Sequence, residues 1–432
     1  MHYDVVVAGG GTAGCVLAGR LSEDSGRTVC IVEAGPDYGH YDHGRWPADI
    51  LDGRGLALDS HCWERSDEQD RSQLRAQILG GCSSHNACVI LRGSDSDYDA
   101  WGPGWTASDL RPYLDRAEHA FATRVLDESE LSPFIKAFVE ASGAAAIVHP
   151  VNMTVDGVRW NAAFAWIDPA RERENLTIQA DTIVDRVLLD GACAIGVATS
   201  AGDIRADTVV IAASAYGSPA ILLRSGITDL PVGENLSDHV GTGMGWEPTE
   251  QLRADWDRWT ADHPLAFAGV TIRAADGDLF LFPAVEPGYE ISAAVFAMRP
   301  RSLGRVSLTA ADPRAPLAID HGFLSHEADV QVLVQGFEQL RELGRTEAVR
   351  RYAERENRPG ESVSAESHVR ATARGFFHPT GTCGIGRVVD ESGRVYGYEN
   401  LVVADASIMP TIPRVNTNLT TAAIAEKLAE TI

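Results

Sequence analysis

A glycine-rich turn near the N-terminus, residues 9–14, constrains the fold more than any other part of the sequence. It reads Gly-Gly-Gly-Thr-Ala-Gly and follows directly on an apolar run at residues 5–8. A helix-like segment, 15–21, comes next, and a second apolar run, 28–32, ends at Glu33. A strand, a glycine turn, a helix, a second strand and an acid in this order predict a Rossmann-type unit that binds a dinucleotide.

Each part of this unit has a role in binding a dinucleotide. Glycine lets the backbone approach the pyrophosphate closely, and the N-terminus of the following helix attracts its negative charge. The acid can bind the ribose hydroxyls, and the unit by itself fits FAD and NAD equally. A tight turn without a ligand is the alternative, but the complete unit is far more specific than a glycine motif alone. The residues predicted to bind the cofactor here are Gly9, Gly11, Thr12, Ala13, Gly14 and Glu33.

The length and charge of the chain limit its organisation and its partners. A chain of 432 residues is too long for one simple core, so two domains are expected. The formal net charge of −24 argues against nucleic acid and anionic membranes as partners, because both repel an acidic surface. The sequence contains no run of about 18 apolar residues, so it predicts no membrane span.

The cysteines and the N-terminus bear on the location of the protein. The cysteines number seven and form no C-x-x-C pattern, so neither a disulfide framework nor a metal site is expected. The chain enters a strand directly, without the basic and long apolar regions of a signal peptide. We therefore expect a soluble cytoplasmic protein.

Two segments near the C-terminus supply candidate catalytic residues. His378 precedes Pro379 and small turn residues, which fix its imidazole at the end of a rigid loop. An unperturbed histidine titrates at about pH 6.5, so it can take or return a proton at working pH. Asn416 offers a side-chain donor that can stabilise charge on an oxygen without ionising. Structural roles for both residues are the alternative, and the N-terminal unit argues against it.

Two further segments resemble the signatures of a known family. Residues 75–101 contain Gly80-Gly81 followed by Cys-Ser-Ser-His-Asn at 82–86, and residues 214–227 form a second signature. They resemble the glucose–methanol–choline (GMC) oxidoreductases, a family of flavoproteins, and several motifs occur in that family's order. Within this family, segment 82–86 is similar to the corresponding motif of the choline oxidase-like members.

The resemblance implies FAD as the cofactor and adds residues that contact it. The histidine of this motif carries FAD covalently in choline oxidase-like members, so His85 is the candidate attachment site. An ordinary histidine that is hydrogen-bonded near the cofactor is the alternative. The family also places segment 401–407 against the flavin phosphates and ribityl chain. The cofactor-binding residues that the resemblance implies are Gly81, Ser84, His85, Asn86, Ala87, Val184 (near adenine), Asp405, Ala406 and Thr417.

The expected fold class is α/β (α+β overall), with a Rossmann-type FAD-binding domain and a second, sheet-based substrate domain, as in the GMC fold. The FAD-binding domain is assigned to residues 1–100, 175–244 and 385–432. The substrate-binding domain is assigned to residues 101–174 and 245–384. Within the second domain, a helix that ends near residue 120 is expected, with Ser108 as its N-cap.

The activity that the resemblance implies is oxidation of a primary or secondary alcohol to an aldehyde or ketone, by hydride transfer to flavin N5. In this scheme His378 is the base and Asn416 stabilises the alkoxide, while His239 is expected to be structural. The partners are a small-molecule alcohol and oxygen or another electron acceptor. The rival hypotheses are a nicotinamide-dependent dehydrogenase with the same N-terminal unit and a lyase on the same flavoprotein fold. A third, a non-catalytic flavin-binding protein, is disfavoured by the presence of His378 and Asn416.

Three arginines argue against choline as the substrate. Recognition of a quaternary ammonium group needs an aromatic cage and usually a carboxylate. Arg54 replaces an expected aromatic residue, Arg273 lies in a segment without the expected acid, and Arg299 stands where a second histidine is expected. An arginine in the cavity would repel a cation, so a neutral or anionic alcohol is the better expectation. A surface position for these arginines is the alternative.

Overall fold

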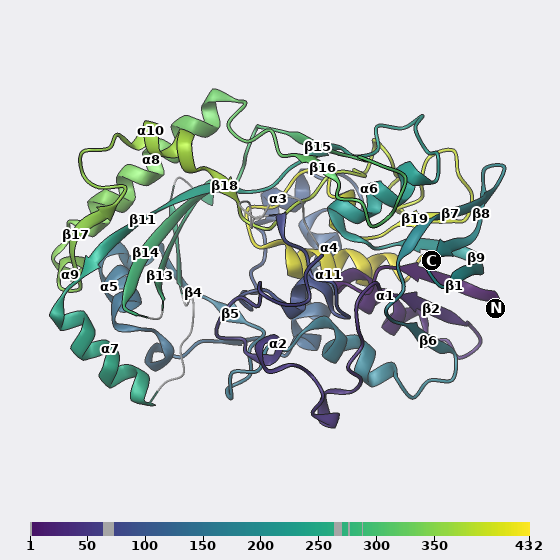
Figure 1. Ribbon diagram of the computed structural model, residues 1–432, viewed down its shortest axis with the longest axis horizontal. Helices are drawn as coiled ribbons and strands as arrows, with labels where there is room; N and C mark the ends of the chain where they lie inside the picture. Colours follow the sequence, from purple (N-terminus) through teal and green to yellow (C-terminus); the bar gives the residue numbers. More distant parts are fainter. Residues whose placement is uncertain (1, 64–72, 263–269, 275–276, 287) are drawn as a thin grey trace.

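The computed structural model describes residues 2–63, 73–262, 270–274, 277–286 and 288–432. These residues form two large sheets at opposite ends of an elongated molecule, with helices between and around them (Figure 1). Both ends of the chain lie at the right of the view, beside the first sheet. The expected architecture of a Rossmann-type domain joined to a second, sheet-based domain is confirmed.

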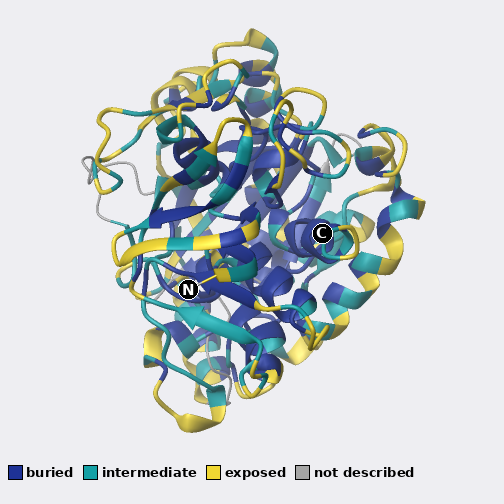
Figure 2. Cartoon of the chain, turned by 90° about the vertical axis from the view of Figure 1, so that its right-hand side faces the viewer, coloured by how far each residue is buried: buried dark blue, intermediate teal, exposed yellow. Residues whose placement is uncertain are grey.

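The first sheet has seven strands in the order β6-β2-β1-β9-β8-β7, with β19 also paired to β9. Strand β1 runs parallel to β2 and β9, whereas β7, β8 and β9 form an antiparallel meander. Figure 2 shows the buried strands at the centre of the molecule, inside a shell of exposed residues. The strands are β1 (His2–Ala8), β2 (Val29–Val32), β6 (Leu176–Gln179), β7 (Val184–Asp190), β8 (Cys193–Thr199), β9 (Gly202–Ile211) and β19 (Leu401–Val403).

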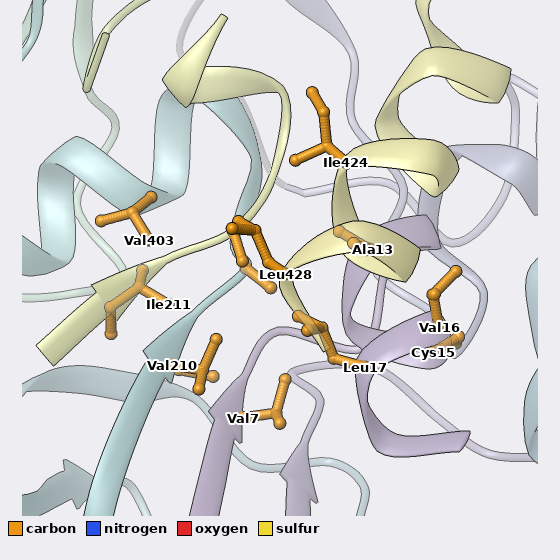
Figure 3. Close-up of a cluster of buried hydrophobic side chains, with 14 of the residues drawn as sticks. Val7, Ala13, Cys15, Val16, Leu17, Val210, Ile211, Val403, Ile424 and Leu428 are labelled. Carbon is orange, nitrogen blue, oxygen red and sulfur yellow. The ribbon is translucent and has the colours of Figure 1, made fainter. Parts of the chain in front are cut away.

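Helices α1 (Thr12–Leu21) and α11 (Thr417–Leu428) pack together against this sheet. All residues of α1 except Arg20 are buried, as expected of a helix that is apolar on every side. Figure 3 shows their side chains meeting those of β1, β9 and β19, with Leu17 and Leu428 near the centre of the cluster. This core therefore fixes the N-termini of both helices relative to the carboxyl end of β1.

The second sheet is antiparallel and has the order β17-β11-β14-β13-β12-β4, with β18 paired to β11. Leu279 and Leu281 pack in a core with α5 (Pro133–Ser142) and α8 (Glu327–Gly344), whereas the alternate residue Phe280 belongs to a separate cluster with Val415. One face of the sheet therefore carries helices, and the other faces the C-terminal segment of the first domain. The strands are β4 (Ala146–Val148), β11 (Val240–Pro248), β12 (Val270–Ala274), β13 (Leu279–Glu286), β14 (Glu290–Ala297), β17 (Ala353–Arg358) and β18 (Arg374–Gly375).

The remaining elements connect these two units. The helices among them are α2 (Ala48–Leu51), α3 (Asp95–Asp99), α4 (Ala107–Ala120), α6 (Ser214–Arg224), α7 (Glu250–Asp262), α9 (Glu347–Arg350) and α10 (Ala365–Thr372). The strands among them are β3 (Arg124–Val125), β5 (Pro150–Val151), β10 (Glu234–Leu236), β15 (Gly304–Ser307) and β16 (Ala318–Asp320). Within the described residues, no helix is both long and apolar enough to cross a membrane.

The structure differs from the sequence expectation at α4. The N-cap is Thr106 rather than Ser108: its hydroxyl accepts a hydrogen bond from the N–H of Asp109, and the Asp109 carboxylate bonds back in a capping box. Helix α4 also packs in the core of the first sheet through Leu110 and Leu114, although the expected division placed it in the substrate domain. The domain boundaries themselves remain a proposal.

Candidate active site

The glycine turn lies between β1 and α1, at the carboxyl end of the strand. Gly9 has a φ of +109°, and a Cβ at this residue would lie 2.6 Å from the carbonyl oxygen of Ala212. A Cβ at Gly14 would clash with the carbonyl oxygen of Gly9. Only glycine fits at these two positions, so the backbone is left free to approach a ligand.

Glu33 closes the turn from the end of β2. One oxygen of its carboxylate accepts the N–H of Gly10 and the other that of Gly35, each at 2.8 Å. Burial raises the pKa of Glu33 to about 7. The N–H of Thr182 donates to the Glu33 carbonyl at 2.8 Å. This hydrogen bond places Val184, the first residue of β7, close to Glu33. A carboxylate accepts about four hydrogen bonds, so Glu33 retains capacity for ribose hydroxyls.

The N-termini of α1 and α11 lie side by side. Neither N-cap, Gly11 or Asn416, makes a capping hydrogen bond through a side chain. The Thr12 hydroxyl donates to the side-chain oxygen of Asn418 at 2.8 Å and ties the two helix ends together. Two adjacent helix N-termini with uncapped N–H groups favour a negatively charged ligand such as a pyrophosphate.

Asp405, predicted to contact the cofactor, directs its carboxylate into the protein. It accepts hydrogen bonds from the N–H groups of Ser214 and Ser407, both at 2.8 Å, and from the hydroxyl of Ser218. Asp405 therefore fixes the loop that carries Ala406, and only its main chain remains to meet a cofactor.

The segment around His85 packs directly on the glycine turn. The N–H of Gly80 donates to the Gly10 carbonyl at 2.8 Å, and a Cβ at Gly81 would lie 2.6 Å from the Cα of Gly11. Ser84 is buried in the short 3₁₀ helix Gly81–Ser84 that follows. The structure thus joins two motifs that are separated by about 70 residues in the sequence, as a shared dinucleotide site requires.

His85 is buried at the end of this 3₁₀ helix. Its Nε2 has no hydrogen-bond partner among the described residues, and its Nδ1 lies 3.9 Å from the Sγ of Cys62. Burial lowers the pKa of His85 to about 4. Beside it, the Asn86 side chain accepts the N–H of Cys88, and Ala87 packs with the cluster that contains Phe280. A neutral imidazole with a free, buried Nε2 fits a role toward a cofactor.

His378 and Asn416 meet as the sequence predicts. The Nε2 of His378 lies 3.4 Å from the Nδ2 of Asn416, and the His378 N–H donates to the Asp238 carboxylate at 2.9 Å. The pKa of His378 lies well below 6.5, first because the imidazole is buried and second because of His239 and Arg75 nearby. His378 is therefore neutral and has its Nε2 beside an amide donor.

His239, which was expected to be structural, lies beside His378, and this contact was not foreseen from the sequence. Its Nδ1 lies 2.9 Å from the Nδ1 of His378, and the two rings are nearly perpendicular. The pair forms because Ser237 and Thr380 join in an antiparallel bridge that aligns their segments. The one available signal was the position of His239 in a family-like motif, directly after Asp238.

Aromatic side chains form a wall beside His378. Phe376 lies 4.6 Å from the His378 ring centroid and stacks on Phe296 at 3.7 Å. Phe296 pairs with Phe280 across β14 and β13, and Phe280 pairs with Arg273 across β13 and β12. These residues share one face of the second sheet, so they form a row that leads toward His378.

The three arginines noted in the sequence occupy different environments. The half-buried Arg273 guanidinium lies 5.4 Å from the Phe280 ring centroid, and its Nε has no hydrogen-bond partner among the described residues. Arg299 is exposed, and Arg54 pairs with Asp52 at 2.6 Å. Of the three, Arg273 is the one placed on the aromatic face.

Comparison with known proteins decides the family. Residues 3–241 and 300–425 match the family described as GMC oxidoreductase. The chain belongs to the GMC oxidoreductase family. The resemblance and the fold that it implied are therefore confirmed.

Curated relatives and a solved structure agree with this assignment. The GMC chain is 33% identical to a 5-(hydroxymethyl)furfural oxidase of Methylovorus sp., over 100% of this chain and 98% of the relative. It is 32% identical to an oxygen-dependent choline dehydrogenase of Paraburkholderia phytofirmans, over 100% and 94%. The crystal structure of pyridoxine 4-oxidase from Mesorbium loti matches with a TM-score of 0.86 and 25% identity, over 99% of both chains.

As a GMC oxidoreductase, the protein is an FAD enzyme that oxidises CH–OH donors, as its homologues do. The nicotinamide-dependent alternative is therefore set aside. The glycine turn, the paired helix N-termini and the buried His85 Nε2, which has no partner among the described residues, fit FAD. The roles of individual residues belong to the proposal that follows.

We expect Gly81→Ala to lower the FAD content of the GMC enzyme. The new Cβ would press on Gly11, and the φ of +55° disfavours a side chain, so we expect FAD affinity to fall by roughly tenfold or more. The measurement is the ratio of flavin to protein absorbance after purification. Gly191→Ala is the control, because Gly191 has a φ of +61° but open space around it. Equal FAD content in both variants would contradict this description of the site.

Proposed function

We propose that this enzyme oxidises a primary or secondary alcohol to an aldehyde or ketone, with His378 as the base and Asn416 as the group that stabilises the alkoxide. The convergence of the His378 Nε2 and the Asn416 Nδ2 in a buried site is the observation that carries the proposal. Three relatives are named for oxidation of hydroxymethylfurfural, choline and pyridoxine, and each of these compounds is an alcohol.

The proton steps follow from the state of His378. It begins neutral, so its Nε2 can accept the hydroxyl proton of an alcohol bound between it and Asn416. The Asn416 amide then donates to the developing alkoxide oxygen, where an uncharged donor stabilises negative charge in a water-poor site. The Asp238 carboxylate keeps the His378 loop in place through two main-chain N–H groups.

Bound FAD would supply the acceptor for the hydride of the carbinol carbon, at N5, and a route for the electrons to oxygen or another acceptor. Its pyrophosphate would lie on the N-terminus of α1, its ribose at Glu33 and its adenine near Val184. The chain's contribution is to hold the alcohol, remove its proton and exclude water. The residues proposed to hold FAD are Gly9, Gly11, Thr12, Ala13, Gly14, Glu33, Gly81, Ser84, His85, Asn86, Ala87, Val184, Asp405, Ala406 and Thr417.

The substrate is proposed to be a neutral or anionic alcohol with a flat apolar part. The Phe376 ring, which is partly exposed and stacks on Phe296, offers apolar area beside the base. Arg273 at the end of this row has no carboxylate partner within salt-bridge distance among the described residues, so it disfavours a cation such as choline.

The proposal includes a cytoplasmic location. All seven cysteines are free thiols, and the Cys82 side chain is exposed. Free thiols of this kind are typical of proteins in reducing compartments, where disulfides are rare.

We expect His378→Ala to retain FAD and to lose turnover by roughly a hundredfold or more, because the base is removed while the cofactor site is left intact. The measurement is the initial rate of oxidation of a hydroxymethyl arene, normalised to bound flavin. His119→Ala, which changes an exposed histidine of α4, is the control. Wild-type turnover in His378→Ala would rule out this base.

The pH dependence follows from the direction of the His378 pKa. Burial lowers this pKa well below 6.5, so His378 stays neutral as the pH falls through 6.5 and is protonated only at lower pH. We expect kcat/KM for the alcohol to remain level between about pH 8 and pH 6.5. A profile that rises through a pKa near 6.5 would show that the base is not shielded as the structure indicates.

We expect FAD to be attached covalently through His85, since its neutral Nε2 is buried and makes no hydrogen bond to any residue that the structure describes. After acid precipitation of the enzyme, the yellow flavin should stay with the pellet. In His85→Ala the flavin should move to the supernatant, while the unfolding temperature shows whether the fold is kept. Flavin released from the wild-type enzyme would leave His85 as a hydrogen-bonding residue only.

A further inference from the structure

His239 is held from both sides of its ring. Its Nε2 lies 3.1 Å from the carbonyl oxygen of Pro413, and its Nδ1 lies 2.9 Å from the Nδ1 of His378. The side chain is fully buried and is in contact with Phe376 as well. In the proposed reaction, His378 and Asn416 handle the proton of the alcohol, and His239 has no role so far.

The partners of the ring dictate where its proton lies. A carbonyl oxygen only accepts hydrogen bonds, so the contact with Pro413 requires a proton on the His239 Nε2. Burial lowers the pKa of His239 to about 3, so the imidazole is neutral and carries a single N–H. Its Nδ1 is therefore a bare acceptor.

The same reasoning extends to His378. A short contact between two Nδ1 atoms needs one proton between them, and His239 cannot supply it. His378 must donate from its own Nδ1, which leaves its Nε2 unprotonated beside Asn416. This is the tautomer that a base acting through Nε2 needs.

We propose that His239 is a positioning residue that fixes His378 in the Nδ1–H tautomer and so keeps the Nε2 available as the base. The assignment of the tautomer stands on the structure, while its catalytic consequence rests on the proposed function. Without His239, His378 could carry its proton on Nε2, where it would face the donor of Asn416 and could not accept a proton from the alcohol.

The fold supports this role through consecutive residues. Ser237 and Thr380 exchange two main-chain hydrogen bonds, at 3.1 and 2.9 Å, which set the register between their segments. Asp238 then accepts the main-chain N–H of His378, and His239 meets the ring. The backbone and the side chain of the base are thus fixed by neighbouring residues of the short connection between β10 and β11.

A competing arrangement places the His239 proton on Nδ1 instead of Nε2, which reverses the donor in the histidine pair. In that case the base nitrogen of His378 would be protonated. The two arrangements predict opposite protonation of the His378 Nε2, which is directly observable.

Nitrogen NMR of the holoenzyme labelled with ¹⁵N-histidine reads the tautomer without any turnover. The His378 signals are assigned by their loss in His378→Ala. We expect a protonated Nδ1 and a bare Nε2 for His378 in the wild-type enzyme. A protonated Nε2 overturns the proposal whether or not the enzyme oxidises alcohols. The expected tautomer in an enzyme that oxidises none would instead overturn the proposed function alone.

A matched pair of variants tests the catalytic consequence. The side-chain oxygen of Asn takes the place of the Nδ1 of histidine, so His239→Asn retains an acceptor, whereas His239→Leu fills similar space without one. We expect kcat to fall by roughly a hundredfold or more in His239→Leu with KM little changed, and to stay within about tenfold in His239→Asn. Equal kcat values in two folded variants would mean that His239 only fills space. If His239→Leu does not fold, the NMR experiment on the wild-type enzyme decides.

Discussion

The antiparallel bridge between Ser237 and Thr380 is the interaction on which the active site depends. It joins the segment that leads into the second sheet at β11 to the segment that leads back toward β19 in the first. Without this register, Asp238 would not reach the His378 main chain and Asn416 would have no base beside it. The proposed catalytic residues thus lie between the two sheets, where a flavin held by the first domain would meet a substrate held by the second.

Burial controls the chemistry at this junction. It keeps His378 and His239 neutral and raises the pKa of Asp238 to about 7, with the Arg75 guanidinium opposing that rise. Each neutral imidazole has one donor nitrogen and one acceptor nitrogen. The directions of its hydrogen bonds therefore decide which nitrogen can accept a proton, and net charge decides less. The His85 Nε2 is buried as well, and it has no hydrogen-bond partner in the part of the chain that the structure describes.

The features that could be predicted from the sequence are those that depend on the local conformation of the backbone. The glycine turn and Glu33 follow from short-range sterics and hydrogen bonding, and both lie where they were expected. The partnership of His239 with His378 could not be predicted, because it depends on pairing between segments about 140 residues apart. The N-cap of α4 was assigned two residues late, since Ser108 and Thr106 are both good caps and Asp109 selects between them.

The central claim is that alcohol oxidation at this site reduces bound flavin. The most direct measurement is the absorption spectrum of the purified enzyme under anaerobic conditions, before and after a hydroxymethyl arene is added. We expect the visible absorption band of the oxidised flavin to bleach on the timescale of turnover. A flavin band that no alcohol bleaches, as in a lyase with a redox-silent flavin, would contradict the account.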